Sequence, residues 1–219
     1  MFYLRLILVF GRPESKLVSE IVQFILKKLN HTSLGDSKGL VGIDSRIERL
    51  KTLLCIRSSE ARIIGIWGMG GIGKTTIAEA VFNSISSQYE SCCFITNVRE
   101  KSEECVGLIR LREEFLSRVL GQENLRIDTP RMGSTLIKER IRHKKVLTVL
   151  DDVNDVEQVE CLIERHDMFG PGSRILVTSR DRQVLKNVAD EIYEVEELNC
   201  SEARQLFSLS VFNQGGKLC

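Results

Sequence analysis

The stretch Gly68-Met69-Gly70-Gly71-Ile72-Gly73-Lys74-Thr75 decides the fold, because it matches the pattern GxxxxGK[ST] in full. An apolar run at 63–67 precedes it and predicts a buried strand, and residues 74–87 predict a helix. A strand, a glycine-rich loop and a helix in this order are the context that the pattern requires. The stretch therefore predicts a phosphate-binding loop.

Each residue type in this loop has a physical reason. Glycines let backbone N–H groups turn towards an anion without a Cβ atom in the way, and the following helix directs the positive end of its dipole to the same place. Lys74 adds a point charge for the β- and γ-phosphates, and the Thr75 hydroxyl is a ligand for Mg²⁺. Thr76 adds a further hydroxyl for the phosphates. The predicted nucleotide-binding residues of this segment are Gly68, Met69, Gly70, Gly71, Ile72, Gly73, Lys74, Thr75 and Thr76.

The same glycines also fit a second pattern, GxGxxG, which is typical of dinucleotide-binding domains. That interpretation requires an acidic residue about twenty positions further on, at the end of the next strand, to bind the ribose. The next predicted strand, 93–98, ends in Asn97 and Val98 instead. The interpretation also leaves the Lys74-Thr75 pair without a role. The phosphate-binding loop is therefore favoured.

From residue 62 onwards, short apolar runs alternate with helical patterns. This alternation is typical of parallel strands joined by right-handed helical crossovers. We therefore expect an α/β fold of the P-loop NTPase type, with three layers and a five-stranded, mainly parallel sheet, preceded by an N-terminal helix at 15–30. Another helix is expected to begin after Asp44, its predicted N-cap. The predicted strands are 63–67, 93–98, 145–150, 174–178 and 192–195, and the later predicted helices are 74–87, 108–120, 134–142, 156–164, 182–188 and 201–212.

A second candidate segment is Val146-Leu147-Thr148-Val149-Leu150-Asp151-Asp152. Its apolar residues predict a buried parallel strand, and its two carboxylates follow at the C-terminal edge of the sheet, where ligands of open α/β sheets bind. Asp151 is then the expected partner of the Mg²⁺ shell, and Asp152 is placed to polarise an attacking water as a catalytic residue. Ordinary strand-to-loop turns have the same composition, so the interpretation depends on the phosphate-binding loop upstream.

A third candidate segment runs from Gly170 to Asp181 and contains a turn, a short strand and then polar residues at the same edge. Arg180 is positioned to contact a terminal phosphate, because a guanidinium group suits bidentate contact with phosphate oxygens. A solvated loop arginine paired with Asp181 fits the sequence equally well. Both interpretations of Arg180 therefore stay open at this point.

Composition and charge argue against several other classes. Lys and Arg total 31 and Asp and Glu total 30, so we expect no nucleic-acid partner, which needs a concentrated basic face. The seven cysteines form no CxxC pair and no zinc-like spacing with the histidines, and we expect reduced thiols of a cytoplasmic protein. Residues 1–10 are apolar but too few to span a bilayer, and they lack the features of a signal peptide. No membrane span is therefore expected.

The order of these motifs resembles the nucleotide-binding (NB-ARC) module of plant disease-resistance receptors, from about Arg12 to Asn213. Two features are similar to the subclass whose receptors begin with a TIR domain, namely Phe94-Ile95-Thr96-Asn97-Val98-Arg99-Glu100, and Val153-Asn154-Asp155 where other subclasses have a tryptophan. The other segments that carry the resemblance are Leu40-Val41-Gly42-Ile43-Asp44, the phosphate loop through Thr76, Val149-Leu150-Asp151-Asp152-Val153, Gly172-Ser173-Arg174-Ile175, Thr178-Ser179-Arg180-Asp181, Tyr193-Glu194-Val195-Glu196-Glu197-Leu198 and residues 203–212.

This resemblance implies an ADP/ATP-binding switch, in which ADP keeps the receptor inactive and exchange for ATP allows oligomerisation. It implies a leader, helix and linker at 1–39, a nucleotide-binding P-loop NTPase domain at 40–198, and the start of a helical ARC region at 199–219. No TIR domain, later ARC motif or leucine-rich repeat is recognisable, so the expectation is a truncated switch. Val41 and Gly42 are the expected wall on the base side of the nucleotide.

Two other functions remain open. An active Mg²⁺-dependent P-loop ATPase, slow at most, would use Asp152 to position water. A truncated interaction partner would pair with intact receptors of the same family through its α/β domain. The sequence does not fix the base either, although the lack of a guanine-reading NKxD pattern favours ADP or ATP.

Overall fold

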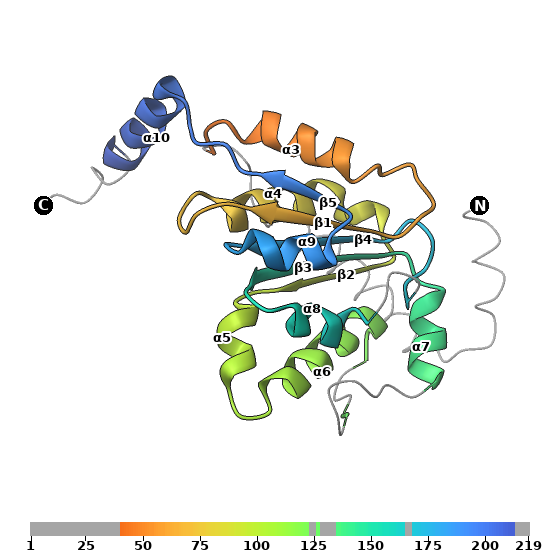
Figure 1. Cartoon of the computed structure of the whole chain (residues 1–219). Coiled ribbons are helices and arrows are strands. Elements are labelled where there is room, and N and C mark those ends of the chain that lie inside the picture. The colour runs from red at the N-terminus through yellow and green to blue at the C-terminus, as the bar shows by residue number, and fades with distance from the viewer. Residues whose placement is uncertain (1–39, 123–125, 128–134, 165–167, 213–219) are drawn as a thin grey trace, which may run out of the picture. The chain divides into compact units, whose positions relative to one another are not determined.

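The computed structural model describes residues 40–122, 126–127, 135–164 and 168–212, and these contain a five-stranded sheet. The strand order is β2-β3-β4-β1-β5, and each pair of neighbours is parallel. Figure 1 shows helices on both faces of this sheet, so the predicted three-layer α/β fold is confirmed. The helix expected at 15–30 lies outside the described residues.

The strands end together at one edge of the sheet. In the register of the sheet, Trp67 at the end of β1 and Val153 at the end of β3 both lie opposite Ser179 at the end of β4. The loops that follow these three strands therefore open at the same edge, next to one another. The strands are β1 (Arg62–Trp67), β2 (Ser91–Ile95), β3 (Val146–Val153), β4 (Arg174–Ser179) and β5 (Glu191–Glu194).

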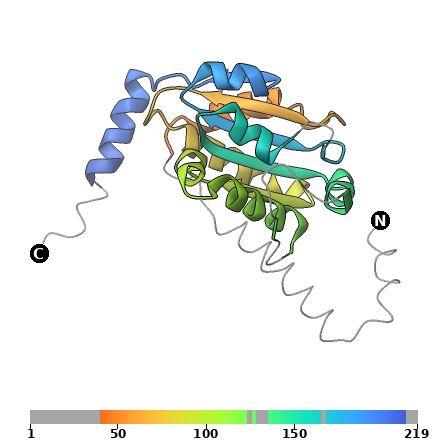
Figure 2. The ribbon, with the colours of Figure 1, turned by 60° about the horizontal axis from the view of Figure 1, so that its bottom comes forward.

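Helices cover both faces of the sheet (Figure 2), and a hydrophobic layer holds them on each face. Helices α3 and α4 pack on one face, where Ile64 and Ile66 of β1 point, and α5, α6, α8 and α9 pack on the other, where Ile63 points. This alternation is the period-2 pattern of a strand that is buried on both faces. The described helices are α3 (Ile43–Leu53), α4 (Lys74–Ile85), α5 (Val98–Glu103), α6 (Gly107–Leu120), α7 (Thr135–Arg142), α8 (Val156–Leu162), α9 (Arg182–Val188) and α10 (Cys200–Phe212), with a 3₁₀ turn, η1 (Ser86–Gln88).

Two local predictions were wrong. The strand expected at 93–98 ends at Ile95, because Asn97 adopts a left-handed φ of 54° and Val98 begins helix α5. Asn is one of the few residues with a side chain that adopt this conformation readily, and the strand pattern concealed it. The expected N-cap Asp44 lies inside the first turn of α3, and Gly42, at φ 66°, is the N-cap. Asp44 is still favourably placed there, since the positive end of the helix dipole is near.

Arg174 connects the segment that follows α3 to the edge of the sheet where β1 and β4 begin. The residue is fully buried at the start of β4, and burial lowers the pKa of its guanidinium group. The guanidinium donates hydrogen bonds to the backbone carbonyls of Leu54, Cys55, Ser58, Glu60 and Ser173. Four of these carbonyls belong to the segment between α3 and β1. This one side chain therefore joins most of that segment to the start of β4, next to the end of α3.

No helix within the described ranges is both long enough and apolar enough to cross a bilayer.

Candidate functional site

The glycine-rich loop joins β1 to α4 at the edge of the sheet where the strands end. Gly71 has a φ of 79° and Gly73 a φ of 102°. A Cβ atom at either position would meet no heavy atom within 4 Å, so space is not what requires glycine there. The left-handed backbone requires it, because this conformation is strained for residues with a side chain. Gly73 is also the N-cap of α4, which directs the dipole of that helix at the loop.

Lys74 lies inside the loop rather than in solvent. Its Nζ atom donates to the carbonyl oxygens of Gly68 at 2.9 Å and Met69 at 2.7 Å, and the residue is buried. Burial lowers the pKa of Lys74, and the positive charge of Arg180 lowers it further, against the opposing effect of two nearby carboxylates. The loop therefore contains a fixed ammonium group at its centre, as a phosphate cradle requires.

Asp151 joins the loop to the end of β3. Its Oδ1 atom accepts hydrogen bonds from the hydroxyl of Thr75 at 2.9 Å and from the hydroxyl of Thr178 at 2.7 Å, and the residue is buried. Hydroxyl and carboxylate oxygens are the protein ligands that Mg²⁺ prefers, usually one or two of them together with phosphates and water. Thr75 and Asp151 fit this chemistry. Among the described residues, no group of three or more His, Cys, Asp or Glu side chains gathers into a metal site built from protein alone.

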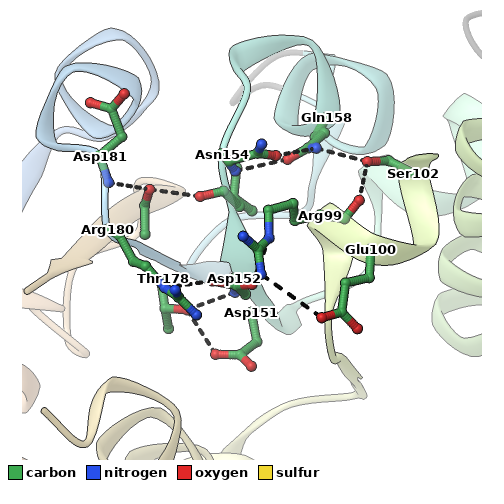
Figure 3. Close-up of polar contacts among 12 residues, drawn as sticks. Arg99, Glu100, Ser102, Asp151, Asp152, Asn154, Gln158, Thr178, Arg180 and Asp181 are labelled. Atoms are coloured by element: carbon green, nitrogen blue, oxygen red, sulfur yellow. Dashed lines mark hydrogen bonds and ion pairs between the residues drawn. The ribbon is translucent and has the colours of Figure 1, made fainter. Parts of the chain in front are cut away.

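Asp152 adopts an unusual backbone conformation, with a φ of 58° at an irregularity in the β3–β4 ladder. Its backbone N–H donates to the Thr178 hydroxyl at 2.9 Å, which fixes this turn. Figure 3 shows the carboxylate between two arginines. Nε of Arg99 lies 3.1 Å from Oδ2, and Nε of Arg180 lies 3.4 Å from Oδ1. The left-handed turn thus places both oxygens of Asp152 against positive charge.

Arg180 contacts Asp152 rather than its neighbour Asp181, whose carboxylate instead accepts from the backbone N–H of Gln183 and caps α9. A Cβ atom at Gly70 would lie 3.4 Å from Nη1 of Arg180, so the guanidinium lies over the loop. The structure therefore favours the position of Arg180 at the phosphate loop over a pair between Arg180 and Asp181.

Most of the predicted residues line one cavity of about 340 Å³ at the loop. The predicted residues brought together there are Gly70, Gly71, Gly73, Lys74, Thr75, Thr76, Asp151, Asp152 and Arg180, and the sequence interpretation missed Asn97, Arg99, Glu100 and Thr178. Three of these missed residues follow β2, and the fourth lies near the end of β4. The signal that could have found them is their position just at or after the C-terminal end of a parallel strand.

A second, larger cavity of about 880 Å³ adjoins the first residues of the loop. Its lining is mainly apolar and comes from the loop, from α3 and from β5 and the residues that follow it. Gly68, Met69 and Ile72 line this cavity, together with Trp67 and Tyr193. These three predicted loop residues therefore face a different space from the other six.

Val41 and Gly42 line neither of these cavities. The carbonyl oxygen of Gly42 accepts from Nη1 of Arg46 at 2.6 Å, and the same nitrogen lies 3.4 Å from Oε1 of Glu202 in α10. A Cβ atom at Gly42 would lie 2.3 Å from that oxygen. Gly42 thus belongs to the contact between α3 and α10, and the base-side role of Val41 and Gly42 stays a prediction.

This geometry agrees with a comparison across known families, in which residues 43–217 match the NB-ARC domain. The chain belongs to the NB-ARC family. NB-ARC domains are nucleotide-binding modules with the P-loop NTPase fold, which accounts for the loop, the parallel sheet and the two threonines on Asp151.

Relatives of this NB-ARC chain include plant disease-resistance proteins. The chain is 39% identical over 205 residues to disease resistance protein RPV1 of Vitis rotundifolia, an alignment that covers 93% of this chain and 15% of that protein. It is 40% identical over 189 residues to disease resistance protein RPP4 of Arabidopsis thaliana, covering 85% of this chain and 16% of that protein. The chain therefore spans only about 15% of the length of these relatives.

Among solved structures, the NB-ARC chain is similar in fold to a chain of the E. coli MS115-1 HORMA:CdnC:Trip13 complex. The TM-score is 0.50 and the sequence identity 14%, over 81% of this chain and 68% of that one. At this identity the similarity concerns the fold alone.

Proposed function

We propose that this chain is the ADP/ATP-binding switch module of a plant disease-resistance receptor. The observation that carries the proposal is the contact of Thr75 and Thr178 with one carboxylate oxygen of Asp151, beside a loop that encloses Lys74. This arrangement supports a phosphate site at the loop with a neighbouring Mg²⁺ site at Thr75 and Asp151. A cytoplasmic location fits such a switch, because adenine nucleotides and Mg²⁺ are plentiful there.

The cavity at the loop accounts for the phosphates. Backbone N–H groups of the loop and the ammonium of Lys74 would bind the β- and γ-phosphate oxygens, and Thr75 and Asp151 would supply the protein oxygens for Mg²⁺. Bound Mg²⁺ neutralises charge on the phosphates. Arg180, which lies over the loop, contacts the terminal phosphate. Each of these roles uses a residue that lines the same cavity.

The larger cavity accounts for the base and ribose. It begins at Gly68 and Met69, where the phosphate loop begins, so a nucleotide held by its phosphates reaches it without crossing the sheet. Its walls include Trp67, Ile72 and Tyr193, which offer apolar and aromatic surface to a purine. Burial of that surface contributes roughly 25 cal/mol per Å². We assign adenine because the sequence has no guanine-reading NKxD pattern.

A slow ATPase is a second candidate, and the position of Asp152 favours it. The carboxylate lies in the phosphate cavity, where it can orient an attacking water. Both of its oxygens, however, are in contact with arginines. A carboxylate so occupied accepts a hydrogen bond from water poorly, so we expect turnover to be slow, as in a switch. Pairing with intact receptors of the same family also stays a prediction.

The nucleotide that accompanies the purified chain tests this proposal. The chain is purified without added nucleotide, denatured, and the released small molecules are separated and identified by mass spectrometry. We expect ADP in the released fraction. We also expect added ADP with Mg²⁺ to raise the melting temperature, because a ligand that binds only the folded chain stabilises it. A guanine nucleotide in the released fraction, or a melting temperature that ADP does not change, would contradict the proposal.

A further inference from the structure

Arg99 lies in the phosphate cavity although no motif assigns it a role. It is the second residue of α5 and lines the same cavity as Lys74 and Thr75. Its guanidinium meets the carboxylate of Asp152, on the oxygen that Arg180 does not contact (Figure 3). Two arginines from different elements therefore share one carboxylate beside the proposed position of the terminal phosphate.

The contact between Arg99 and Asp152 is incomplete. Nε of Arg99 lies 3.1 Å from Oδ2, but this nitrogen is buried and has no hydrogen-bond partner among the described residues. Nη2 lies 3.8 Å from Oε1 of Glu100, which is too far for a hydrogen bond. A buried donor without an acceptor is costly and rare in native proteins, and each case requires an explanation. An anionic oxygen that enters the cavity would be such an acceptor.

Hydrogen bonds hold the backbone of Arg99, whereas its guanidinium makes only ion pairs among the described residues. The Ser102 hydroxyl donates to the carbonyl oxygen of Arg99 at 2.7 Å, and Nε2 of Gln158 donates to that hydroxyl at 2.8 Å. Oε1 of Gln158 also accepts from the backbone N–H of Asn154, in the turn that follows Asp152. Helix α5 is therefore tied to the same turn that carries Asp152. A change of partner by Arg99 needs only a rotation of its side chain.

We propose that Arg99 binds the terminal phosphate of a nucleoside triphosphate and thereby distinguishes it from a diphosphate. When the site holds a diphosphate, the guanidinium stays on Asp152. The terminal phosphate of a triphosphate supplies the missing acceptor, so Arg99 turns to it. This inference rests on the proposed nucleotide-binding function and adds the residue that detects the nucleotide state.

The test compares two ligands on the full chain, both with Mg²⁺: ADP and an ATP analogue that cannot be hydrolysed. For Arg99→Gln we expect calorimetry to show a loss of roughly tenfold or more in affinity for the ATP analogue, because one charge-assisted contact is missing. The affinity for ADP should stay within about threefold of the wild type. Arg99→Lys keeps the charge and should recover part of the affinity for the analogue.

Arg110→Gln is the matched control. Arg110 is an exposed residue of α6 that pairs with Glu104 outside the cavity, so the same change of charge should affect neither ligand. A loss with Arg99→Gln that is equal for both ligands, or absent for both, would overturn the role of Arg99 while leaving the proposed function intact. A wild-type chain that binds neither ligand would overturn the proposed function itself.

A second variant decides the matter if Arg99→Gln does not fold. In Asp152→Asn, the carboxylate no longer competes with the terminal phosphate for Arg99. The affinity for the ATP analogue relative to ADP should then rise several-fold. A ratio that stays the same or falls would overturn the proposal.

Discussion

Replacement of Arg174 by methionine tests whether one buried guanidinium positions α3. Methionine keeps most of the aliphatic stem but removes every donor to the five carbonyls. A hydrogen bond to a charged group contributes about 1.5–3 kcal/mol, and these contributions are not additive. The substitution also removes the desolvation cost of a buried cation, and part of the segment 54–60 can reach water. We therefore expect a net loss of about 3 kcal/mol in the free energy of unfolding.

That loss is a large part of the 5–15 kcal/mol that is typical of a domain, and urea denaturation measures it. Arg57→Met is the matched control, because Arg57 is exposed in the same segment and its loss should stay within about 0.5 kcal/mol. Since α3 lines the larger cavity, the Arg174 variant should also bind nucleotide more weakly. An unfolding free energy within about 1 kcal/mol of the wild type would refute the reasoning.

Three further predictions concern carboxylates. Asp151→Ala should weaken Mg²⁺-dependent ATP binding more than metal-free ADP binding in calorimetry; equal losses would make the residue purely structural. Asp152→Asn should lower any Mg²⁺-dependent phosphate release by about a hundredfold or more, the usual contribution of a general base, and an unchanged rate would exclude that role. Burial alone would raise the pKa of Glu164, but the hydrogen bond from Lys138 and the charge of Arg112 lower it overall. Because the pKa of Glu164 is lower in the folded chain, the wild type should be more stable than Glu164→Gln above the unfolded pKa of about 4.3. This difference in the free energy of unfolding should disappear as the pH falls below that value. Denaturation curves that show the same difference at every pH would contradict the prediction.

The sheet could be predicted from the sequence because buried parallel strands are continuous apolar runs. β1, β3 and β4 were expected within three residues of their observed ends, and the loop that joins β1 to α4 was expected from its glycines. Helix α5 was not expected, because its six residues begin soon after β2 and only Thr96 and the left-handed Asn97 separate the two. A short helix of this kind has too few residues for a periodic pattern.

The site was predicted less completely than the fold. Local sequence patterns locate the phosphate loop and the two carboxylates, Asp151 and Asp152, that follow β3. No such pattern locates Arg99, which lines the cavity because of the position of α5. The larger cavity was not expected either, since its walls come from residues far apart in the sequence. Gly42 lies in a motif that is recognisable in the sequence, but it lines neither of the two cavities, and its carbonyl oxygen accepts a hydrogen bond from Arg46. Such contacts depend on tertiary packing that no local pattern records.

The measurement that tests the central claim most directly is calorimetric titration of ADP with Mg²⁺ into the wild-type chain and into Lys74→Ala. Within the described part of the chain, Nζ of Lys74 donates to two carbonyls of the loop alone, so its removal should leave the fold of the nucleotide-free chain largely intact. Binding of ADP should fall by at least a hundredfold, because the cradle loses its fixed charge. A Lys74→Ala chain that binds ADP as tightly as the wild type would contradict the assignment of the phosphates to this loop.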